Sequence, residues 1–295
     1  MYTIKQLVEE ATSKLEEKNI IDARVEAEIL LEHLQHFSRM ELYLHLQDTV
    51  DEKLANSYWE LIEQRKKRLP LAYILGECEF MGLKFFVSPK VFIPRPETEL
   101  LVEKVIKFTF SEGGSTYSEG IGAGQPLILD LGTGCGNIAI SLAKFVSNTA
   151  IYATDISVEA LDVAKRNAQY HGIDSRIHFL LGNLYEPLER LNMQKEIALI
   201  VCNPPYIFYE ELRFLQPEIF YEPRTAYFCG ENGLNYYQTI ICQAKKYLCP
   251  RGYLFLEINP QSVYEIQNLF LSEGFKEIVI VKDYSGYDRI VYGQS

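Results

Sequence analysis

The sequence contains no apolar stretch of about 18 residues, the length that a membrane-spanning helix needs. Its first residues enter a helical pattern directly and lack the basic, apolar and small-residue order of a secretion signal. Its six cysteines include no CxxC pair and have no cluster of histidines beside them, so we expect neither a metal site nor a disulfide framework. These absences predict a cytoplasmic protein with no membrane association, no metal ion and reduced thiols.

Positive charge is scarce as well. The chain has 29 Lys and Arg against 40 Asp and Glu, a net charge of -11. Non-specific duplex binding depends on Lys and Arg that neutralise phosphates, so we expect no stable nucleic-acid partner and favour a protein or small-molecule substrate. The basic run Arg65-Lys66-Lys67-Arg68 ends an expected helix, where the helix dipole favours cations. We interpret this run as a solvated helix end, with contact to RNA or to an acidic partner as the alternative.

The first third of the chain contains two successive residue patterns, one helical and one rich in aromatic residues, glycine and proline. With 295 residues, 47% of them hydrophobic and 23% charged, the chain is long enough for one large or two ordinary globular domains. Apolar residues recur at helical spacing up to Leu69, which predicts a helical bundle over residues 1–70 that ends at Pro70. In residues 71–96 aromatic residues alternate with glycine and proline, which indicates a short hairpin and an interdomain linker.

The remaining residues, 97–295, alternate between helical and strand patterns. A doubly wound, mostly parallel α/β sheet is expected from this alternation. The last two strands are joined by a turn too short for a crossover helix, so they should pair antiparallel. Residues 111–126 are too rich in glycine to pack, which predicts a flexible surface loop without a chemical role. The expected strands are residues 127–131, 150–154, 177–181, 197–202, 253–258, 278–282 and 289–292.

A glycine-rich turn, Gly132-Thr133-Gly134-Cys135-Gly136, follows the first of these strands and opens a helix. Its glycines permit close approach of a ligand to the helix N-terminus, and the lack of a lysine argues against a nucleotide triphosphate. Asp155 closes the next strand, where a carboxylate can accept both ribose hydroxyls, and Asn183-Leu184 follows the third strand, where a side-chain carbonyl could accept from an adenine amine. Adenosine without phosphates fits best. The alternatives are a plain turn, a helix N-cap at Asp155 and an ordinary loop at Asn183.

The tetrapeptide Asn203-Pro204-Pro205-Tyr206 follows an almost wholly apolar strand and should lie at the carboxyl edge of the sheet beside the cofactor. Two prolines remove backbone donors and leave carbonyl acceptors. An amide or aryl amine nitrogen is a poor nucleophile, and acceptors such as the Asn203 side-chain oxygen and the Pro204 carbonyl favour the positive charge that develops on it during methyl transfer. Tyr206 can stack on the flat substrate. The sequence therefore predicts an S-adenosylmethionine-dependent methyltransferase that acts on such a nitrogen, with a simple strand-ending turn as the alternative.

Four stretches together resemble one enzyme family: Phe92–Glu99 (Phe-Ile-Pro-Arg-Pro-Glu-Thr-Glu), Asp130–Gly136, Asn203–Tyr206 and Glu222–Ala226. The chain looks like the protein-(glutamine-N5) methyltransferases of class I peptide-chain release factors, the PrmC/HemK family. The resemblance runs from about Leu69 to the C-terminus, after a similar helical region. It implies a Rossmann-like, seven-stranded class I methyltransferase sheet behind a small helical domain. A protein substrate must be presented by a docked partner, so we expect this helical domain to dock the substrate, with the alternative that residues 1–69 simply cap the core. The resemblance also implies a release factor as the protein partner of a chain that we expect to be a monomer.

The resemblance also implies roles for individual residues. Gly132 to Gly136 and Asp155 would bind S-adenosylmethionine, with Asn183, Leu184 and Asn203 completing that site. Asn203 to Tyr206 would hold the glutamine amide, with Asn203, Pro204 and Tyr206 catalytic, and Arg95 and Glu97 would line the substrate channel. Where the family usually has an acidic and then an aromatic residue after the third strand, this chain has Asn183-Leu184.

Other functions remain open at this point. The same tetrapeptide serves enzymes that methylate adenine N6 in DNA or RNA, or a glutamine of a ribosomal protein. The acidic chain and the lack of a large target-recognition segment argue against DNA. A non-catalytic cofactor-binding module that regulates translation factors is the third possibility.

Overall fold

The computed structural model describes residues 2–110, 126–230 and 233–295. The segment that we predicted to be a flexible glycine-rich loop lies outside the described residues except for Pro126. The chain forms two compact units. The first comprises Met1–Glu77 together with Gln216–Tyr221, and the second comprises Cys78–Leu215 together with Glu222–Ser295. No helix within the described ranges is both long and apolar enough to cross a bilayer.

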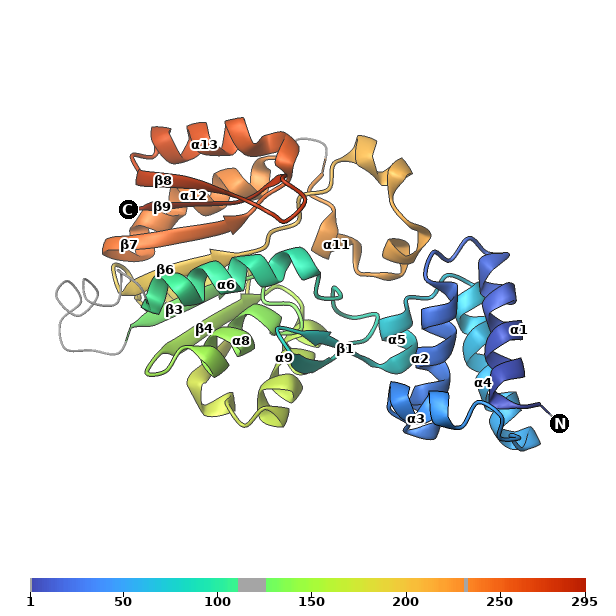
Figure 1. Ribbon diagram of the computed structural model, residues 1–295. Helices are drawn as coiled ribbons and strands as arrows, with labels where there is room; N and C mark the ends of the chain where they lie inside the picture. Colours follow the sequence, from blue (N-terminus) through green and yellow to red (C-terminus); the bar gives the residue numbers. More distant parts are fainter. Residues whose placement is uncertain (1, 111–125, 231–232) are drawn as a thin grey trace. The chain divides into compact units, whose positions relative to one another are not determined.

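The first unit is the helical bundle that the sequence predicted (Figure 1). Thr3 caps the first helix with a capping box, and Asp51 accepts from a backbone N–H at the start of the fourth. The sequence did not predict the fifth helix. Pro70 stands at its N-cap and Gly76, with φ of +73°, ends it in the left-handed region. The helices are α1 Ile4–Glu16, α2 Ala23–Gln35, α3 Arg39–Leu44, α4 Glu52–Lys66 and α5 Leu71–Leu75.

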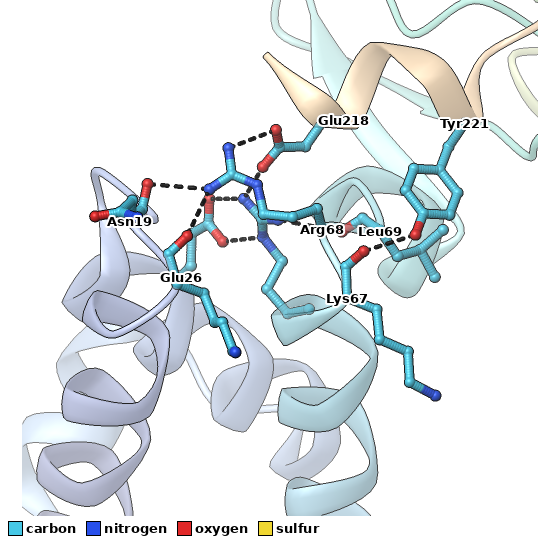
Figure 2. Close-up of polar contacts among 9 residues, drawn as sticks. Asn19, Glu26, Lys67, Arg68, Leu69, Glu218 and Tyr221 are labelled. Atoms are coloured by element: carbon cyan, nitrogen blue, oxygen red, sulfur yellow. Dashed lines mark hydrogen bonds and ion pairs between the residues drawn. The ribbon is translucent and has the colours of Figure 1, made fainter.

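Two arginines of the basic run at the end of α4 form ion pairs within the chain, so our interpretation of the run as a solvated helix end is wrong for these two of its four residues. The Arg65 side chain is 6% exposed and pairs with Glu26 and, at 2.8 Å, with Glu218. Arg68 pairs with the other oxygen of Glu218 at 2.7 Å (Figure 2). Glu218 comes from Gln216–Tyr221, a segment far along the chain that belongs to this unit. The arginines therefore bind an acidic group of the same chain.

The second unit contains a seven-stranded sheet of order β5-β4-β3-β6-β7-β9-β8. The first five strands in this order are parallel, and β9 pairs antiparallel with both β7 and β8. The doubly wound sheet and the antiparallel closing pair are therefore confirmed. The strands are β3 Leu127–Leu131, β4 Ala150–Asp155, β5 Ile177–Leu181, β6 Ile197–Cys202, β7 Leu248–Glu257, β8 Lys276–Lys282 and β9 Asp288–Gln294.

Alternation along β7 shows how the two faces of this sheet are covered. Leu254 and Leu256 belong to the core cluster that includes residues of α12 and α13. Phe255 points to the opposite face, where the ring centroid of Phe108 from α6 lies 5.4 Å from that of Phe255. The helical segments of this unit are α6 Pro96–Phe110, α8 Asn137–Phe145, α9 Val158–Tyr170, η1 Asp174–Arg176, α10 Glu186–Arg190, η2 Tyr209–Phe214, α11 Arg224–Tyr227, α12 Asn235–Tyr247, η4 Pro260–Ser262 and α13 Val263–Ser272.

Two further segments complete the chain. The predicted hairpin is formed by β1 Glu77–Phe80 and β2 Leu83–Phe86, and all of it except Glu77 belongs to the second unit. The short helix η3, Pro217–Tyr221, lies in the segment that packs with the first unit.

Candidate functional site

A cleft lies where the carboxyl ends of β3, β4, β5 and β6 meet, the edge at which open α/β sheets bind ligands. The structure brings twelve of the predicted site residues to its wall. Gly136 and Glu97 are not among the lining residues, and Glu97 is exposed on the first turn of α6. The predicted residues that line the cleft are Arg95, Gly132, Thr133, Gly134, Cys135, Asp155, Asn183, Leu184, Asn203, Pro204, Pro205 and Tyr206.

The glycine loop between β3 and α8 needs its glycines for two different reasons. Gly132, Gly134 and Gly136 have φ of +70°, +56° and +86°, a region that side chains disfavour. A Cβ at Gly132 or Gly134 would meet no atom within 4 Å, so open space faces the loop there. At Gly136 a Cβ would lie 2.8 Å from Ile140 Cδ1, so this glycine permits close packing against the helix. Gly132 and Gly134 leave room for a ligand, and Gly136 lets the loop pack closely against α8.

Asp130, which was not among the predicted site residues, binds this loop and the start of α8 through its side chain. It is fully buried, and its Oδ2 accepts from the Thr133 hydroxyl at 2.7 Å and from the Ala139 backbone N–H at 3.2 Å. Its Oδ1 is buried with no hydrogen-bond partner among the described residues. Burial raises the pKa of this carboxyl to about 7, and the two hydrogen bonds oppose that rise. A lone acid near the end of an apolar strand, two residues before the first glycine of the loop, was the available signal.

Asp155 is tied to the same loop and does not cap a helix. Its Oδ2 accepts from the Gly134 N–H at 2.8 Å and its Oδ1 from the Ser157 N–H at 2.9 Å. The side chain that caps α9 is that of Ser157, so the helix-cap alternative for Asp155 is wrong. Burial raises the pKa of Asp155, although these backbone donors oppose it. Each oxygen keeps a lone pair with which it can accept from a ligand hydroxyl.

Asn183 and Leu184 follow β5 and line the cleft. Asn183 is exposed, and its backbone N–H donates to Glu186 at 3.3 Å. Leu184 is half-buried and has φ of +48°. Both residues line the cleft, so an adenine ring placed there would meet one polar and one apolar side chain.

The tetrapeptide follows β6, all of whose residues are buried. The side-chain nitrogen of Asn203 donates to the Thr98 hydroxyl of α6 at 3.0 Å. An amide that is held through its nitrogen presents its oxygen as the acceptor for another donor. Thr98 is buried and lines the cleft, yet the sequence analysis did not select it although it lies within the Phe92–Glu99 stretch.

At the other end of the tetrapeptide, the Tyr206 hydroxyl donates to Glu257 Oε1 at 3.1 Å. The backbone carbonyl of Tyr206 accepts from the side chain of Asn259 at 3.3 Å. Burial, and then the charge of Glu257, raise the pKa of Tyr206 well above its ordinary value, so this phenol stays protonated. The ring is thus anchored at its hydroxyl while it lines the cleft.

Two of the stretches that resemble a family meet in space beside the cleft. Glu222 is buried and pairs with Arg95, and its other oxygen accepts from the Ile93 N–H at 2.9 Å. Burial raises the pKa of Glu222, and the charge of Arg95 opposes that rise. The guanidinium of Arg95 also lies 4.4 Å from the centroid of the Phe92 ring. Arg95 is therefore held at the cleft wall by two partners, Glu222 and the Phe92 ring.

These residues form an acceptor site next to a ligand cradle. The open space above Gly132 and Gly134 and the carboxylate of Asp155 suit a neutral, hydroxyl-bearing nucleoside. The Asn203 side chain faces the same cleft with an acceptor oxygen. In the described part of the chain, no group of three or more His, Cys, Asp and Glu side chains could hold a metal ion. The arrangement can hold a planar nitrogen donor beside a bound nucleoside.

Both parts of the chain match known protein families. Residues 6–76 match the family model of the PrmC N-terminal domain, and residues 123–216 match that of the methyltransferase small domain. The release factor glutamine methyltransferase of Geobacter sulfurreducens is 35% identical, over 100% of this chain and 97% of the relative. That of Thermodesulfovibrio yellowstonii is 39% identical over 90% of each. The bifunctional methyltransferase of Rickettsia typhi is 36% identical over 98% of this chain, which spans only 57% of that relative's length.

Solved structures share the fold. The catalytic domain of hMettl16 in complex with an RNA hairpin is 15% identical, with a TM-score of 0.52 over 82% of each chain. The 16S rRNA methyltransferase RsmC of T. thermophilus, in complex with AdoMet and guanosine, is 19% identical, with a TM-score of 0.52 over 74% of this chain and 49% of that chain. At such identities the likeness concerns the fold alone.

Proposed function

Because the chain belongs to the family of release factor glutamine methyltransferases, we propose that it methylates the side-chain amide nitrogen (N5) of the glutamine in the Gly-Gly-Gln motif of class I peptide-chain release factors. The observation that carries this proposal is the Asn203 amide. It is held through its nitrogen by Thr98, so its oxygen is left to accept from a substrate nitrogen at the cleft.

We propose S-adenosylmethionine as the methyl donor, and the residues of the cleft fit it. Gly132 and Gly134 leave open space at the start of α8, and Asp155 has acceptor capacity for ribose hydroxyls. Asn183 and Leu184 would contact the adenine. When bound there, S-adenosylmethionine supplies an electrophilic methyl group. The loop has no cationic side chain, which agrees with a cofactor that carries no phosphate.

The chain's own residues make the amide nitrogen reactive. The lone pair of an amide nitrogen is delocalised into the carbonyl group, and it becomes available for attack as the nitrogen pyramidalises. Positive charge then develops on the nitrogen as the methyl group is transferred. Acceptors on its two N–H groups stabilise this change more than they stabilise the planar ground state. The Asn203 oxygen and the Pro204 carbonyl would accept these two hydrogen bonds, and the anchored Tyr206 ring would hold the amide plane and exclude water.

The helical unit would dock the substrate protein. Its helix α3 exposes Met40 and Leu44, at 72% and 74%, and both lie on one face with Tyr43 because they are spaced by three and four residues. Large apolar side chains grouped on a surface are typical of a protein interface. A release factor that docks there would be bound by the same chain that carries the cleft, and the glycines beside its glutamine are small enough to let that glutamine enter the cleft.

Transfer of a tritiated methyl group tests the proposal. The protein is expected to label a release factor and not DNA oligonucleotides, and labelling of the oligonucleotides alone would contradict it. Asn203→Ala should lower kcat by about a hundredfold or more and leave the Kd for S-adenosylmethionine unchanged. Asn56→Ala, an exposed asparagine on α4, serves as the matched control and should retain full activity.

A further inference from the structure

Glu257, the last residue of β7, is fully buried beneath the tetrapeptide. It lies outside all four stretches that resemble the family, and the mechanism above assigns it no role. Its strand is the neighbour of β6, with Cys202 paired to Leu256, so the carboxyl lies next to the point where β6 ends and the tetrapeptide begins. Burial of a carboxyl group is unfavourable unless hydrogen bonds compensate for the lost water. The partners of Glu257 therefore indicate why it is there.

The last residue of the tetrapeptide contacts this carboxyl. The Tyr206 hydroxyl donates to Glu257 Oε1 at 3.1 Å. Glu257 Oε2 is buried and has no hydrogen-bond partner among the described residues, so the contact with Tyr206 is the side-chain hydrogen bond that the geometry gives this carboxyl. Asn203, the first residue, donates to the Thr98 hydroxyl at 3.0 Å, and Thr98 lowers the pKa of Glu257. The two prolines between these ends have no N–H and fixed φ, so they offer no alternative anchor through backbone donors.

The surroundings of Glu257 hold it in place. The Tyr237 hydroxyl of α12 donates to its backbone carbonyl at 3.3 Å. The nearby cation, Arg289 of β9, is itself bound by Asp283 through two hydrogen bonds of 3.0 and 3.1 Å. Burial raises the pKa of the carboxyl to about 7, hydrogen bonds from Thr98 and Tyr206 and the charge of Arg289 lower it, and the charge of Glu97 raises it. The group is thus an acceptor fixed by packing.

We propose that Glu257 is a positioning residue for methyl transfer: it accepts the hydrogen bond of the Tyr206 hydroxyl and so fixes the Tyr206 ring at the cleft. This inference rests on the proposed amide methylation and adds the group that holds the Tyr206 ring against the amide plane. Glu257 acts through the Tyr206 side chain, so its loss should change kcat more than cofactor affinity.

Two substitutions of Glu257 distinguish the effect of its acceptor oxygen from the effect of the space that its side chain fills. Glu257→Gln keeps an acceptor oxygen for Tyr206 at the same reach, whereas Glu257→Leu fills the space without one. Glu257→Leu should lower kcat for a release factor about tenfold or more, with the Kd for S-adenosylmethionine within about twofold of wild type. Glu257→Gln should restore most of the loss, to within about threefold of wild type.

A second pair of variants tests the contact from the other side. Tyr206→Phe removes the hydroxyl that donates to Glu257 and retains the ring. Tyr253 makes a similar contact at 2.6 Å with Glu277 and does not line the cleft, so Tyr253→Phe is the matched control. Tyr206→Phe should lower kcat several-fold and add little to the loss in Glu257→Leu, because both remove the same interaction. Tyr253→Phe should keep full activity.

Hydrogen exchange gives a readout that needs no substrate. The Ile207 N–H, next to Tyr206, donates to the Tyr227 carbonyl at 2.9 Å. In Glu257→Leu this amide should exchange faster than in wild type, while amides of β3 should not change. If Glu257→Leu does not fold, the same comparison is made with Tyr206→Phe.

The outcomes are distinct. Wild-type kcat in a folded Glu257→Leu, or in Tyr206→Phe, overturns the positioning role. So does an equal loss in Glu257→Gln and Glu257→Leu, because an acceptor would then not be what matters. If the wild-type protein itself leaves the release factor unmethylated, the proposed function fails, and unchanged exchange at Ile207 in Glu257→Leu then overturns the positioning role separately.

Discussion

The side-chain nitrogen of Asn203 donates to the hydroxyl of Thr98 at 3.0 Å, although the two residues are 105 positions apart in the chain. The contact joins the loop after β6 to the first turns of α6. It sets which end of the Asn203 amide faces the cleft, and the proposed chemistry needs the oxygen end. The orientation of the Asn203 amide therefore depends on the Thr98 hydroxyl of α6.

Thr98→Val should lower kcat although the new side chain fills the same space as threonine. Valine keeps the size of threonine but cannot accept from Asn203, so the amide loses its preferred orientation. Loss of a hydrogen bond of this kind changes rates by roughly three- to tenfold, and we expect such a fall in kcat with a release factor as substrate. Thr98→Ser retains the hydroxyl and should stay near wild type. Equal kcat in the valine and serine variants would show that the hydroxyl does not orient Asn203.

Two loop glycines should differ in what their replacement damages. Gly136→Ala combines a φ of +86° with a Cβ 2.8 Å from Ile140 Cδ1, so the free energy of unfolding should fall by about 2–4 kcal/mol. Gly134→Ala meets no atom within 4 Å, so it should lower stability by only about 1–2 kcal/mol and weaken S-adenosylmethionine binding instead. Urea unfolding and titration calorimetry measure the two effects. A Gly134→Ala protein with wild-type cofactor affinity would argue against ligand approach at this position.

Arg65→Met should destabilise the helical unit. The variant leaves Glu26 and Glu218 without the guanidinium that binds both in a site where Arg65 is 6% exposed. Removal of one partner from a buried ion pair lowers the free energy of unfolding by about 3–5 kcal/mol. Thermal unfolding monitored by circular dichroism measures the change. The control is Lys66→Met, which removes a more accessible pair with Glu63 and should have an effect under about 1 kcal/mol. Similar losses in both variants would contradict the internal role of Arg65.

Stability should fall as the pH rises from about 4.5 to 7. Burial raises the pKa values of Asp130 and Glu257 to about 7, so the folded state retains protons that the unfolded state has lost. When the folded state binds more protons, the free energy of unfolding decreases with pH. The window runs from the ordinary carboxyl pKa up to about 7, and each group contributes roughly 3 kcal/mol across it.

Urea unfolding at several pH values between 4.5 and 7 checks this slope. Glu257→Gln removes one of these buried carboxyl groups, so the slope of its stability against pH should be shallower than that of wild type. Parallel curves for the two proteins would mean that Glu257 is ionised in the folded state across this range.

Charge placed on α3 should weaken docking of the substrate protein. The double variant Met40→Glu, Leu44→Glu disrupts the exposed apolar face, and KM for a full-length release factor should rise about tenfold while kcat stays the same. A short peptide with the Gly-Gly-Gln sequence lacks the rest of the release factor, including the surface that would dock on α3, so its methylation should be unaffected. Leu271→Glu, at an exposed leucine of α13, is the control and should change neither. An unchanged KM for the full-length protein would exclude α3 as the docking face.

The sequence was sufficient to predict the sheet and most of the cleft wall because these depend on local patterns. The apolar run of β6 predicts burial, and Gly132 to Gly136 directly after β3 predict a turn at a helix N-terminus. The carboxyl ends of parallel strands meet at one edge, so Asp155 and Asn203 could be placed at the cleft without coordinates.

The supporting residues could not be predicted because their partners lie far away in the chain. Glu257 meets Tyr206 across 51 positions, and Glu222 meets Ile93 across 129. No periodicity or local motif encodes such pairs. Arg65 was misinterpreted for the same reason, since a basic helix end is usually solvated and its acidic partner Glu218 comes from a distant segment.

Mass spectrometry of the glutamine peptide from a release factor tests the central claim most directly. The factor is incubated with S-adenosylmethionine and either the wild-type protein or Asn203→Ala. The account predicts that the wild-type protein adds one methyl group to the amide nitrogen of the Gly-Gly-Gln glutamine, and that Asn203→Ala adds almost none. An unmodified glutamine after incubation with the folded, cofactor-bound wild-type protein would contradict it.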